Sequence, residues 1–344
     1  MDSMDSKEMD KYEVLGRIGQ GAHGHVLRAR NKSTNQIVAI KRILIRRRHT
    51  SSVKTDVMRE IKTLLSVSDR YIVKLLDFFP DQDTVCLVFE HMDSGLWELL
   101  HDKKIHLTIP HIKTYMQMLL KGVSYLHGKF IMHRDLKPAN LLIDKAGILK
   151  IADFGLARSF DVERWGQYTP EVASRWYRAP ELLYASRCYD QSVDLWAVGC
   201  ILGEMYTNTP LFLGESDIEQ LAMVLHKLGT PTEDSWPGLK DLPDYNKITF
   251  APSDPVPWST MLPNASPDTL DLISKLLLYD GQKRLPANEA LLHKYFFTHP
   301  LPCIERDLPK PETNHRELLK QEDGGESARA IEELFEEFVR IYDK

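Results

Sequence analysis

The spacing of the hydrophobic residues changes near residue 93, and this change restricts the fold more than any other feature of the chain. Residues 12–43 contain three stretches, YEVLGRI, GHVLRAR and QIVAIKRIL, that partly alternate and are rich in β-branched residues, and VCLVFE at 85–90 resembles them. This pattern is typical of strands. Between them, VKTDVMREIKTLLSV has its hydrophobic residues at helical spacing. We therefore expect a small antiparallel sheet interrupted by one helix.

The remainder of the chain has the periodicity of helices. Hydrophobic residues recur every three or four positions in HIKTYMQMLLKGVSYLH, DTLDLISKLLL and ANEALLHKYFF, whereas SVDLWAVGCILGEMY is apolar nearly all round, as in a buried central helix. The sequence thus predicts an α+β fold with a β-rich lobe at 12–92 and a larger helical lobe at 93–298. An N-terminal extension (1–11) and a C-terminal tail (299–344) flank them.

The C-terminal tail has a helical pattern of its own. ESARAIEELFEEFVRIYDK places five large hydrophobic residues on one stripe, namely Ile331, Leu334, Phe335, Phe338 and Ile341. A helix docked on the body of the same chain and a helix that binds a partner both fit this pattern.

Charge and cysteine usage exclude several classes of protein. The net charge of −5 argues against binding nucleic acid or anionic membranes through bulk charge. The basic run Lys41, Arg42 and Arg46 to Arg48 lies on a predicted strand and the loop that follows it, which favours a solvated face. Four scattered cysteines without CxxC pairs predict neither a disulfide framework nor a zinc site, and we expect them to be buried apolar residues. We also expect neither a signal peptide nor a membrane span.

A glycine-rich segment lies between the first two predicted strands. IGQGAHGHV supplies Gly19, Gly21 and Gly24, whose missing side chains let a backbone close over phosphates, although an ordinary glycine-rich hairpin has the same appearance. VAIK then places Lys41 on a strand, and Glu60 follows on the predicted helix. A lysine paired with such a glutamate can neutralise the α- and β-phosphates of a nucleotide.

The segment IMHRDLKPANLLI holds an Arg, an Asp, a Lys and an Asn between hydrophobic flanks, and IADFGLA follows it. HRDLKPAN matches the catalytic loop of protein kinases and IADFGLA their metal-binding segment, so residues 12–300 resemble that family. The resemblance implies that Asp135 accepts the proton of the acceptor hydroxyl and that Lys137 contacts the transferred phosphoryl group. It also implies that Asn140 and Asp153 hold Mg²⁺.

The resemblance further implies a bilobal fold with ATP in the cleft between the lobes. Gly95 stands where many relatives have an acidic residue near the ribose, so backbone groups of Glu90 and Met92 carry more of the binding, with Ser94 as a substitute. The expected ATP-binding residues are Ile18, Gly19, Gln20, Gly21, Ala22, His23, Gly24, Val26, Ala39, Lys41, Glu60, Phe89, Glu90 and Met92.

Further segments narrow the resemblance to cyclin-dependent kinases. DFGLARSF, VASRWYRAPELL and LGTPTEDSWPGL are similar to that branch, and GAHG, DIEQL and LLHKYFFTHPLP to its cell-cycle-related kinase subgroup. NQIVAIK and HIKTYM are similar to the kinase that activates other cyclin-dependent kinases, which is the alternative. The resemblance implies that the kinase phosphorylates Ser or Thr, as LKPAN is typical of that class, and that a proline follows the acceptor residue in the substrate, through Arg178. It also implies an ion pair between Glu181 and Arg284.

The chain departs from this branch in two regulatory segments. Ala22 and His23 replace the Thr-Tyr pair of the glycine loop, so we expect no inhibitory phosphorylation there. KTDVMRE replaces the PSTAIRE-type sequence and keeps Arg59 and Glu60, so the activating partner is a cyclin, a cyclin-like protein or neither.

Thr169 in GQYTPEVAS is the expected activating phosphorylation site. Arg59, Arg134 and Arg158 come from three functional segments, and a phosphothreonine can gather them through charge-assisted hydrogen bonds. Alternatively, Arg59 and Arg158 pair with acidic neighbours. Because Pro170 follows, both an upstream kinase and trans-autophosphorylation fit the site.

The resemblance implies an ATP- and Mg²⁺-dependent Ser/Thr kinase acting on protein substrates, with a role in cell-cycle or cilium-related signalling. The expected location is the cytoplasm and nucleus, with the cilium as a third site. A pseudokinase scaffold is the competing hypothesis, and the intact Lys41, Glu60, Asp135, Asn140 and Asp153 oppose it. A nucleic-acid-associated protein is disfavoured by the acidic balance.

Overall fold

The computed structural model describes residues 8–21, 24–45, 51–82, 84–160 and 167–309. The described residues form two compact units. The N-terminal unit lies within Met1–Ser68 and Ile72–Ser94, and the C-terminal unit comprises Asp69–Tyr71 and Gly95–Lys310. The predicted tail beyond residue 309, including its amphipathic stripe, lies outside the described residues.

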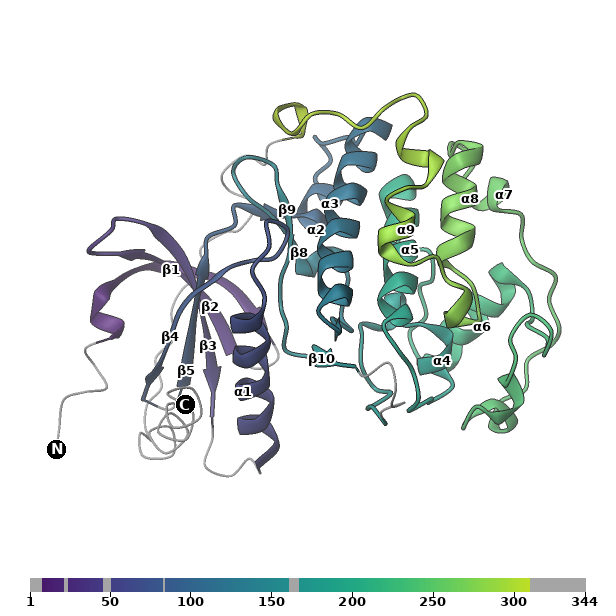
Figure 1. Cartoon of the computed structure of the whole chain (residues 1–344), viewed down its shortest axis with the longest axis horizontal. Helices are drawn as coiled ribbons and strands as arrows, with labels where there is room; N and C mark the ends of the chain where they lie inside the picture. The colour runs from purple at the N-terminus through teal and green to yellow at the C-terminus, as the bar shows by residue number, and fades with distance from the viewer. Residues whose placement is uncertain (1–7, 22–23, 46–50, 83, 161–166, 310–344) are drawn as a thin grey trace. The chain divides into compact units, whose positions relative to one another are not determined.

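The N-terminal unit is a five-stranded antiparallel sheet with one helix, as the hydrophobic pattern predicts (Figure 1). Its strands follow the order β1-β2-β3-β5-β4. The elements are η1 (Met9–Lys11), β1 (Tyr12–Gly21), β2 (Gly24–Asn31), β3 (Ile37–Leu44), α1 (Ser51–Ser66), β4 (Leu75–Asp81) and β5 (Thr84–Glu90). Strand β4 was not expected, because LLDFFPD does not alternate and contains Pro80; its position at the sheet edge tolerates a proline.

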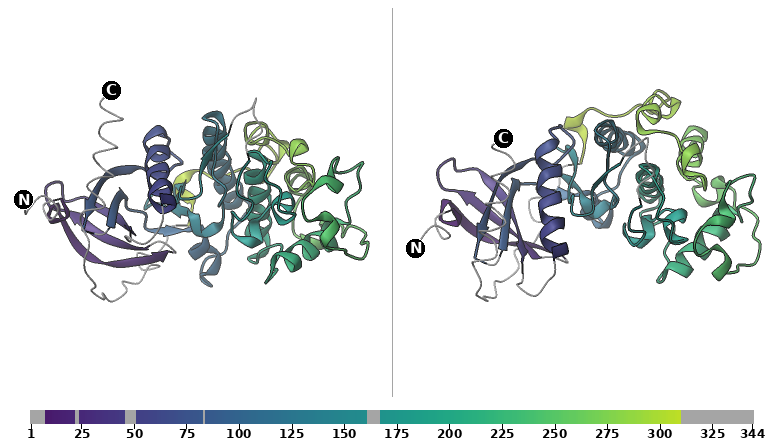
Figure 2. Two further views of the ribbon diagram at one scale, coloured as in Figure 1. Left: turned by 90° about the horizontal axis from the view of Figure 1, so that it is seen from below. Right: turned by 60° about the horizontal axis from the view of Figure 1, so that its bottom comes forward.

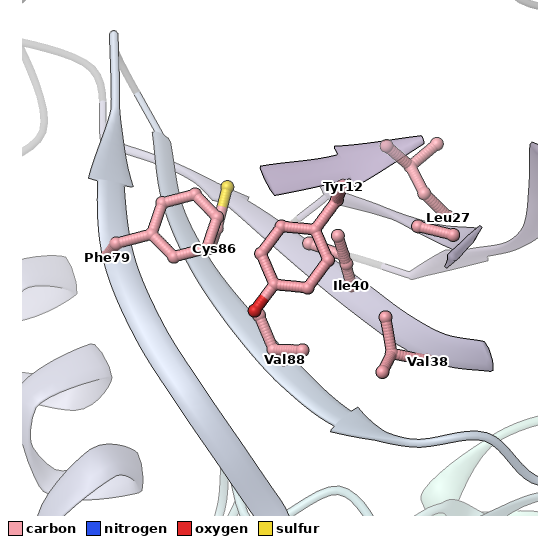
Figure 3. Packing of buried hydrophobic residues seen from close by; sticks show 8 residues of the cluster. Tyr12, Leu27, Val38, Ile40, Phe79, Cys86 and Val88 are labelled. Atoms are coloured by element: carbon pink, nitrogen blue, oxygen red, sulfur yellow. The ribbon is translucent and has the colours of Figure 1, made fainter. Parts of the chain in front are cut away.

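The two faces of this sheet carry different residues. One face holds a buried group that we call the sheet-face cluster (Figure 3): Tyr12, Leu27, Ala29, Val38, Ile40, Phe79, Cys86 and Val88. The rings of Tyr12 and Phe79 stack within it, with centroids 5.9 Å apart. Neighbouring residues of a strand point to opposite faces, so Lys41 points away from Ile40 and the cluster. Because Lys41 contacts Glu60, helix α1 lies on the face opposite the cluster.

The C-terminal unit is mainly helical, and Figure 2 shows its helices from two further sides. Its helices are α2 (Leu96–His101), α3 (Ile109–Gly128), α4 (Pro180–Leu183), α5 (Ser192–Thr207), α6 (Asp217–Leu228), α7 (Trp258–Met261), α8 (Pro267–Leu276) and α9 (Ala287–Ala290). Short strands accompany them: β6 (Ser94–Gly95), which begins at the unit boundary, β7 (Ile131–Met132), β8 (Leu141–Ile143), β9 (Leu149–Ile151) and β10 (Arg158–Ser159).

Helix α5 forms the centre of this unit. It packs against α3 and α8, and most of its residues are buried, as expected from a segment that is apolar all round. Gly199 permits the contact with α8, because a Cβ at this position would come within 2.8 Å of the Leu277 side chain. The helix ends where Asn208 adopts the left-handed conformation with φ 53°.

Two expectations need correction. ANEALLHKYFF was expected to form one helix, but α9 ends at Ala290. A separate 3₁₀ turn, η7 (Lys294–Phe296), follows, and the His293 side chain caps its start by accepting a hydrogen bond from the Tyr295 N–H. The cysteines are also not uniformly buried. Cys86 and Cys200 are buried, whereas Cys188 is exposed and Cys303 is partly exposed.

The predicted Glu181–Arg284 ion pair is confirmed. Both guanidinium nitrogens, Nη1 and Nη2, lie 2.7 Å from the Glu181 carboxylate oxygens, and the arginine side chain is fully buried. Arg284 also donates from Nε to the Leu278 carbonyl oxygen at 2.8 Å and lies over the Trp196 ring. The pair therefore links α4 to the turn that follows α8. No helix of the described ranges is long and apolar enough to cross a membrane.

Candidate active site

The glycine-rich segment joins β1 and β2. Gly19 lies opposite Val26, and Gly21 lies opposite Gly24. Gly24 has φ +154°, and a Cβ there would lie 1.8 Å from the Arg42 carbonyl oxygen, so only glycine fits. The predicted contacts of Ala22 and His23 lie outside the described residues, as does the side chain of Gln20.

One sheet face collects the predicted nucleotide-binding side chains of the N-terminal unit. Val26 pairs with Lys41 and Ala39 pairs with Phe89, and residues opposite one another share a face. All four are partly exposed, whereas Leu27, Ile40 and Val88 beside them are buried on the other face. Ile18 on β1 is 9% exposed. The face that carries α1 is thus the one with accessible side chains near the glycine-rich segment.

Lys41 and Glu60 form the predicted ion pair. The Lys41 ammonium donates to Glu60 Oε1 at 2.7 Å. Glu60 is buried, with 5% of its side chain exposed, and Lys41 is 23% exposed. An ion pair this far from water is screened little by salt, so it holds the lysine against α1.

The predicted hinge residues follow β5. Glu90 pairs with Val38 at the strand end, and its Oε1 accepts the Lys74 N–H at 2.9 Å. Met92 is almost fully buried. The Glu90 N–H also donates to the Lys74 carbonyl oxygen at 3.1 Å, so both the side chain and the N–H of this residue are used within the sheet.

The catalytic loop of the C-terminal unit surrounds the Asp135 carboxylate with donors. Oδ1 accepts the N–H of Ser174 at 2.9 Å and its hydroxyl at 3.0 Å, and Oδ2 accepts Asn140 Nδ2 at 3.0 Å and lies 2.9 Å from Lys137 Nζ. Lys137 also donates to Ser174 Oγ at 2.7 Å. The sequence analysis missed Ser174, because nothing in VASRWYR shows that this residue reaches a loop 39 positions earlier.

The geometry around Asn140 and Asp153 suits a hard cation. Asn140 Nδ2 donates to the backbone oxygen of Asp135 at 2.8 Å and to its carboxylate, which fixes the amide with its oxygen on the other side. The Ala152 N–H donates to the Asn140 carbonyl oxygen at 2.9 Å, placing the next residue, Asp153, beside it. Asp153 has φ +62°, an uncommon conformation for aspartate.

One amide oxygen and one carboxylate match how proteins hold Mg²⁺, which takes few protein oxygens and keeps water and phosphate as other ligands. Within the described ranges, no group of three or more His, Cys, Asp or Glu side chains forms a denser metal site. The residues present therefore fit Mg²⁺ held together with a phosphate.

Asp194 of α5 positions the backbone of the catalytic loop. Its Oδ2 accepts the His133 N–H and its Oδ1 the Arg134 N–H, both at 2.8 Å, and His127 Nε2 lies 3.0 Å from Oδ2. Burial raises the pKa of Asp194, but the His127 hydrogen bond, nearby histidine charge and the Arg134 N–H outweigh it and hold the pKa below its usual value. The sequence analysis assigned no role to Asp194; an acid inside a buried helix was the available signal.

Comparison with known proteins agrees with this geometry. The protein kinase domain matches residues 12–296. The chain belongs to the protein kinase family. It is 52% identical over 305 residues to cyclin-dependent kinase 20 of Danio rerio and 51% identical to that of Homo sapiens, with 88% of each chain covered in both cases. It is 42% identical over 314 residues to cyclin-dependent kinase 7 of Xenopus laevis, covering 91% of this chain and 88% of the relative.

A solved structure is also similar: the CAK complex from Chaetomium thermophilum bound to ATP-gamma-S contains a chain with a TM-score of 0.82 and 34% identity, covering 90% of this chain and 98% of that one. The protein is a cyclin-dependent-kinase-like serine/threonine protein kinase with a small β-rich lobe and a helical lobe.

Two of the three predicted arginines lie near Tyr189, whose hydroxyl contacts the backbone of Thr169. Thr169 is exposed, and its carbonyl oxygen accepts the Tyr189 hydroxyl at 2.7 Å. Arg134 Nη1 donates to the same hydroxyl oxygen at 2.7 Å. Burial raises the pKa of Tyr189, and the charges of Arg134 and Arg158 oppose that effect, so both arginines lie near it.

Arg59 lies in the other unit and has a local partner. Its Nη1 is 2.5 Å from Asp56 Oδ1, one turn earlier in α1. This is the acidic pairing given above as the alternative for Arg59. The Arg59–Asp56 pair is partly exposed and spans one helical turn. Such ion pairs stabilise a helix by about 0.5 kcal/mol or less, so a doubly charged phosphate can displace Asp56 from Arg59.

Arg178 organises the segment just before the WYRAPE sequence. Its Nε donates to the Val172 carbonyl oxygen at 2.8 Å and its Nη2 to the Ala173 carbonyl oxygen at 2.9 Å, while Nη1 contacts Asp217 at 2.8 Å. Ala173 has φ +62°, in the left-handed region. Arg178 thus engages two consecutive carbonyl groups and leaves them less available to an incoming peptide.

Proposed function

We propose that this kinase transfers the γ-phosphoryl group of ATP to Ser or Thr side chains of protein substrates. The observation that carries the proposal is the Asp135 carboxylate, which is fixed by Ser174, Asn140 and Lys137 beside a donor set suited to Mg²⁺. The relative bound to ATP-gamma-S supports ATP as the nucleotide.

In the proposed reaction, the acceptor hydroxyl oxygen attacks the γ-phosphorus of ATP. The bond between the γ-phosphorus and the β–γ bridging oxygen breaks, and ADP leaves. Asp135 accepts the hydroxyl proton, and Lys137 neutralises charge on the transferred group. Lys41, held by Glu60, orients the α- and β-phosphates. Mg²⁺ held by Asn140 and Asp153 would supply charge neutralisation on the phosphates. Catalysis then consists mainly of positioning and electrostatics.

The assignment is tested with Asp153→Asn, which removes a proposed metal ligand and no core volume. We expect loss of Mg²⁺-dependent peptide phosphorylation with an unchanged unfolding midpoint. Turnover equal to that of the wild type would contradict the role of Asp153. ATP–Mg²⁺ binding without turnover in the fully activated wild type would instead favour a pseudokinase scaffold.

We also propose that a proline after the acceptor is preferred. An ordinary residue there brings an N–H that needs an acceptor, and the Ala173 carbonyl is already bonded to Arg178. Proline has no N–H and loses nothing. Paired peptides that differ only in Pro or Ala after the acceptor test this: a higher kcat/KM for the Pro peptide is expected, and equal values would contradict it.

We propose activation through phosphorylation of Thr169, by an upstream kinase or in trans. The nearby Arg134 and Arg158 support this, with Arg59 recruited from α1. The names of the relatives support a cyclin or cyclin-like activator. The altered KTDVMRE sequence of α1 makes the choice of partner specific to this chain.

Two cellular roles are proposed as alternatives. The first is a regulatory role in cell-cycle or cilium-related signalling, in the cytoplasm, nucleus and cilium, which the resemblance of GAHG, DIEQL and LLHKYFFTHPLP to the cell-cycle-related kinase subgroup implies. Similarity to cyclin-dependent kinase 7 and the CAK complex supports phosphorylation of other cyclin-dependent kinases. Assaying the activated protein on activation-segment peptides of such kinases separates the two: efficient phosphorylation supports the second role, and its absence supports the first.

A further inference from the structure

The sheet-face cluster of the N-terminal unit is buried to an unusual degree for the face without α1. Its eight members are each at most 7% exposed, and Ala29, Ile40, Cys86 and Val88 are fully buried. Among the described residues, Met9 is the partly buried hydrophobic side chain that packs against them. Figure 3 shows these side chains lying over the strands on one side of the sheet. Helix α1 lies on the opposite face of the sheet and cannot shield these eight residues from water. Their burial therefore implies that another apolar segment covers this face.

The rim of this face is basic at the end next to the glycine-rich segment. Arg17 pairs with Leu27 and His25 pairs with Arg42, and Leu27 belongs to the cluster, so all of them share its face. Burial lowers the pKa of His25, and so do the charges of Arg42 and Arg17, which places the three groups together. Arg42 also contacts Asp81 at 2.6 Å, and Nε of Arg17 and of Arg42 is buried without a hydrogen-bond partner in the described ranges.

The C-terminal sequence has the matching chemistry. The stripe Ile331, Leu334, Phe335, Phe338 and Ile341 is interleaved with the acidic residues Glu332, Glu333, Glu336 and Glu337. A helix with this sequence presents an apolar stripe with acidic borders. The sheet face presents an apolar cluster with Arg17, His25 and Arg42 at the end next to the glycine-rich segment, where Asp81 pairs with Arg42, and Arg17 and His25 remain to attract acidic side chains.

The length of the chain permits the contact in cis. Residues 310–330 lie between the last described residue and the stripe. At ~3.3–3.6 Å per residue they reach at most about 76 Å, which exceeds the radius of gyration of about 20 Å for a compact domain of this length. The stripe can therefore reach any face of its own chain.

We propose that residues 328–344 dock as an amphipathic helix on the sheet-face cluster of the same molecule, with Phe335 and Phe338 against the cluster. This assigns the occupant left open by the sequence, and it does not depend on the proposed activity. The strands under the helix carry the glycine-rich segment and Lys41, so docking would stabilise the nucleotide-binding half of the kinase.

Cys86 provides a direct reporter, because its thiol lies within the cluster. The experiment measures alkylation of Cys86 by iodoacetamide in the full chain, quantified by peptide mass spectrometry. Phe335→Gln combined with Phe338→Gln should accelerate Cys86 labelling by about tenfold or more, because local opening then exposes the thiol. Asp343→Asn combined with Arg340→Gln, on the polar side of the same segment and with no change in net charge, should leave the rate unchanged.

Cys200, buried in α5 of the other unit, serves as the internal reference for folding. The proposal predicts that its labelling stays slow in both variants, and that an added peptide of residues 326–344 restores Cys86 protection in the Phe335/Phe338 variant. Equal Cys86 rates in wild type and both variants would overturn the proposal, as would a parallel rise at Cys200. Faster wild-type labelling on dilution would assign the cover to a second copy and refute docking in cis.

Discussion

Replacing Asp194 by asparagine is the substitution whose effect the structure specifies most fully. The carboxylate accepts two catalytic-loop N–H groups and contacts His127 while fully buried. Asparagine keeps the shape but replaces one oxygen by an NH₂ group. If its remaining oxygen keeps His133 and His127, the NH₂ group faces the Arg134 N–H, donor against donor.

The magnitude follows from these contacts. A hydrogen bond to a charged group is worth about 1.5–3 kcal/mol, and a buried unsatisfied donor costs about 1–3 kcal/mol. We therefore expect Asp194→Asn to lower the free energy of unfolding by about 3–5 kcal/mol. Arg134 has φ +67° and depends on this contact, so Asp135 next to it should shift. A displacement of about 1 Å can cost about a hundredfold in rate, so kcat should fall by about 10- to 100-fold with little change in the KM for ATP.

Glu204→Gln is the matched control. Glu204 is also a buried acid of α5, but its main partner is a neutral donor, the Tyr177 hydroxyl at 2.6 Å. Burial raises its pKa against the lowering effects of Tyr177 and His101. Glutamine still accepts the Tyr177 hydrogen bond, so we expect a loss below about 1 kcal/mol. Urea unfolding and steady-state peptide phosphorylation measure both variants, and equal losses would refute the assigned role of Asp194.

The pH dependence should differ in sign between these two acids. The folded pKa of Asp194 is lowered, so its stabilisation is present above the unfolded value of about 3.9 and is lost as the pH falls through the folded pKa. The deficit of Asp194→Asn should therefore shrink in acid. The folded pKa of Glu204 is raised, so its contribution is lost as the pH rises through that value, and Glu204→Gln should gain relative to wild type at higher pH.

Three further substitutions test other parts of the account. Arg284→Met leaves Glu181 buried without its partner and should lower the free energy of unfolding by about 3–5 kcal/mol in thermal or urea unfolding, whereas Lys247→Met, which breaks an exposed pair, should cost less than about 1 kcal/mol. Lys41→Met should abolish phosphoryl transfer and, because it leaves the buried Glu60 carboxylate without the Lys41 ammonium, should also lower the free energy of unfolding by about 1–3 kcal/mol; turnover like that of wild type would exclude its phosphate role. Thr169→Ala should reduce activity at least about tenfold relative to the phosphorylated wild type if each lost charge-assisted contact is worth about 1.5 kcal/mol, and equal activity on one peptide would give the arginines another function.

Much of the fold was predictable because local periodicity and packing agree. Strands β1, β2 and β3 partly alternate in sequence, β5 is apolar because its residues are buried on both faces of the sheet, and α5 is apolar all round because helices surround it. Strand β4 could not be found in this way, since LLDFFPD does not alternate and its pairing with β5 comes from the tertiary fold. Residues 287–297 have helical periodicity, but the His293 cap divides them.

The candidate site was predictable to the extent that its chemistry is concentrated in short motifs. Asp135, Lys137 and Asn140 lie within six residues of one another, and the structure brings them together. Ser174 and Asp194 contact the same loop from 39 and about 60 positions away, so only the folded chain shows their roles. Their hydrogen bonds depend on tertiary packing, which sequence motifs do not encode.

Transfer of labelled γ-phosphate from ATP to Ser/Thr-Pro peptides, by wild type and by Asp135→Asn after Thr169 phosphorylation, tests the central claim most directly. The account predicts magnesium-dependent labelling by the wild type and a reduction of about a hundredfold or more in kcat for Asp135→Asn, because a general base contributes about 10²–10⁴-fold. Equal rates for the two proteins would contradict the account, and so would an activated wild type that binds ATP and Mg²⁺ but labels no peptide.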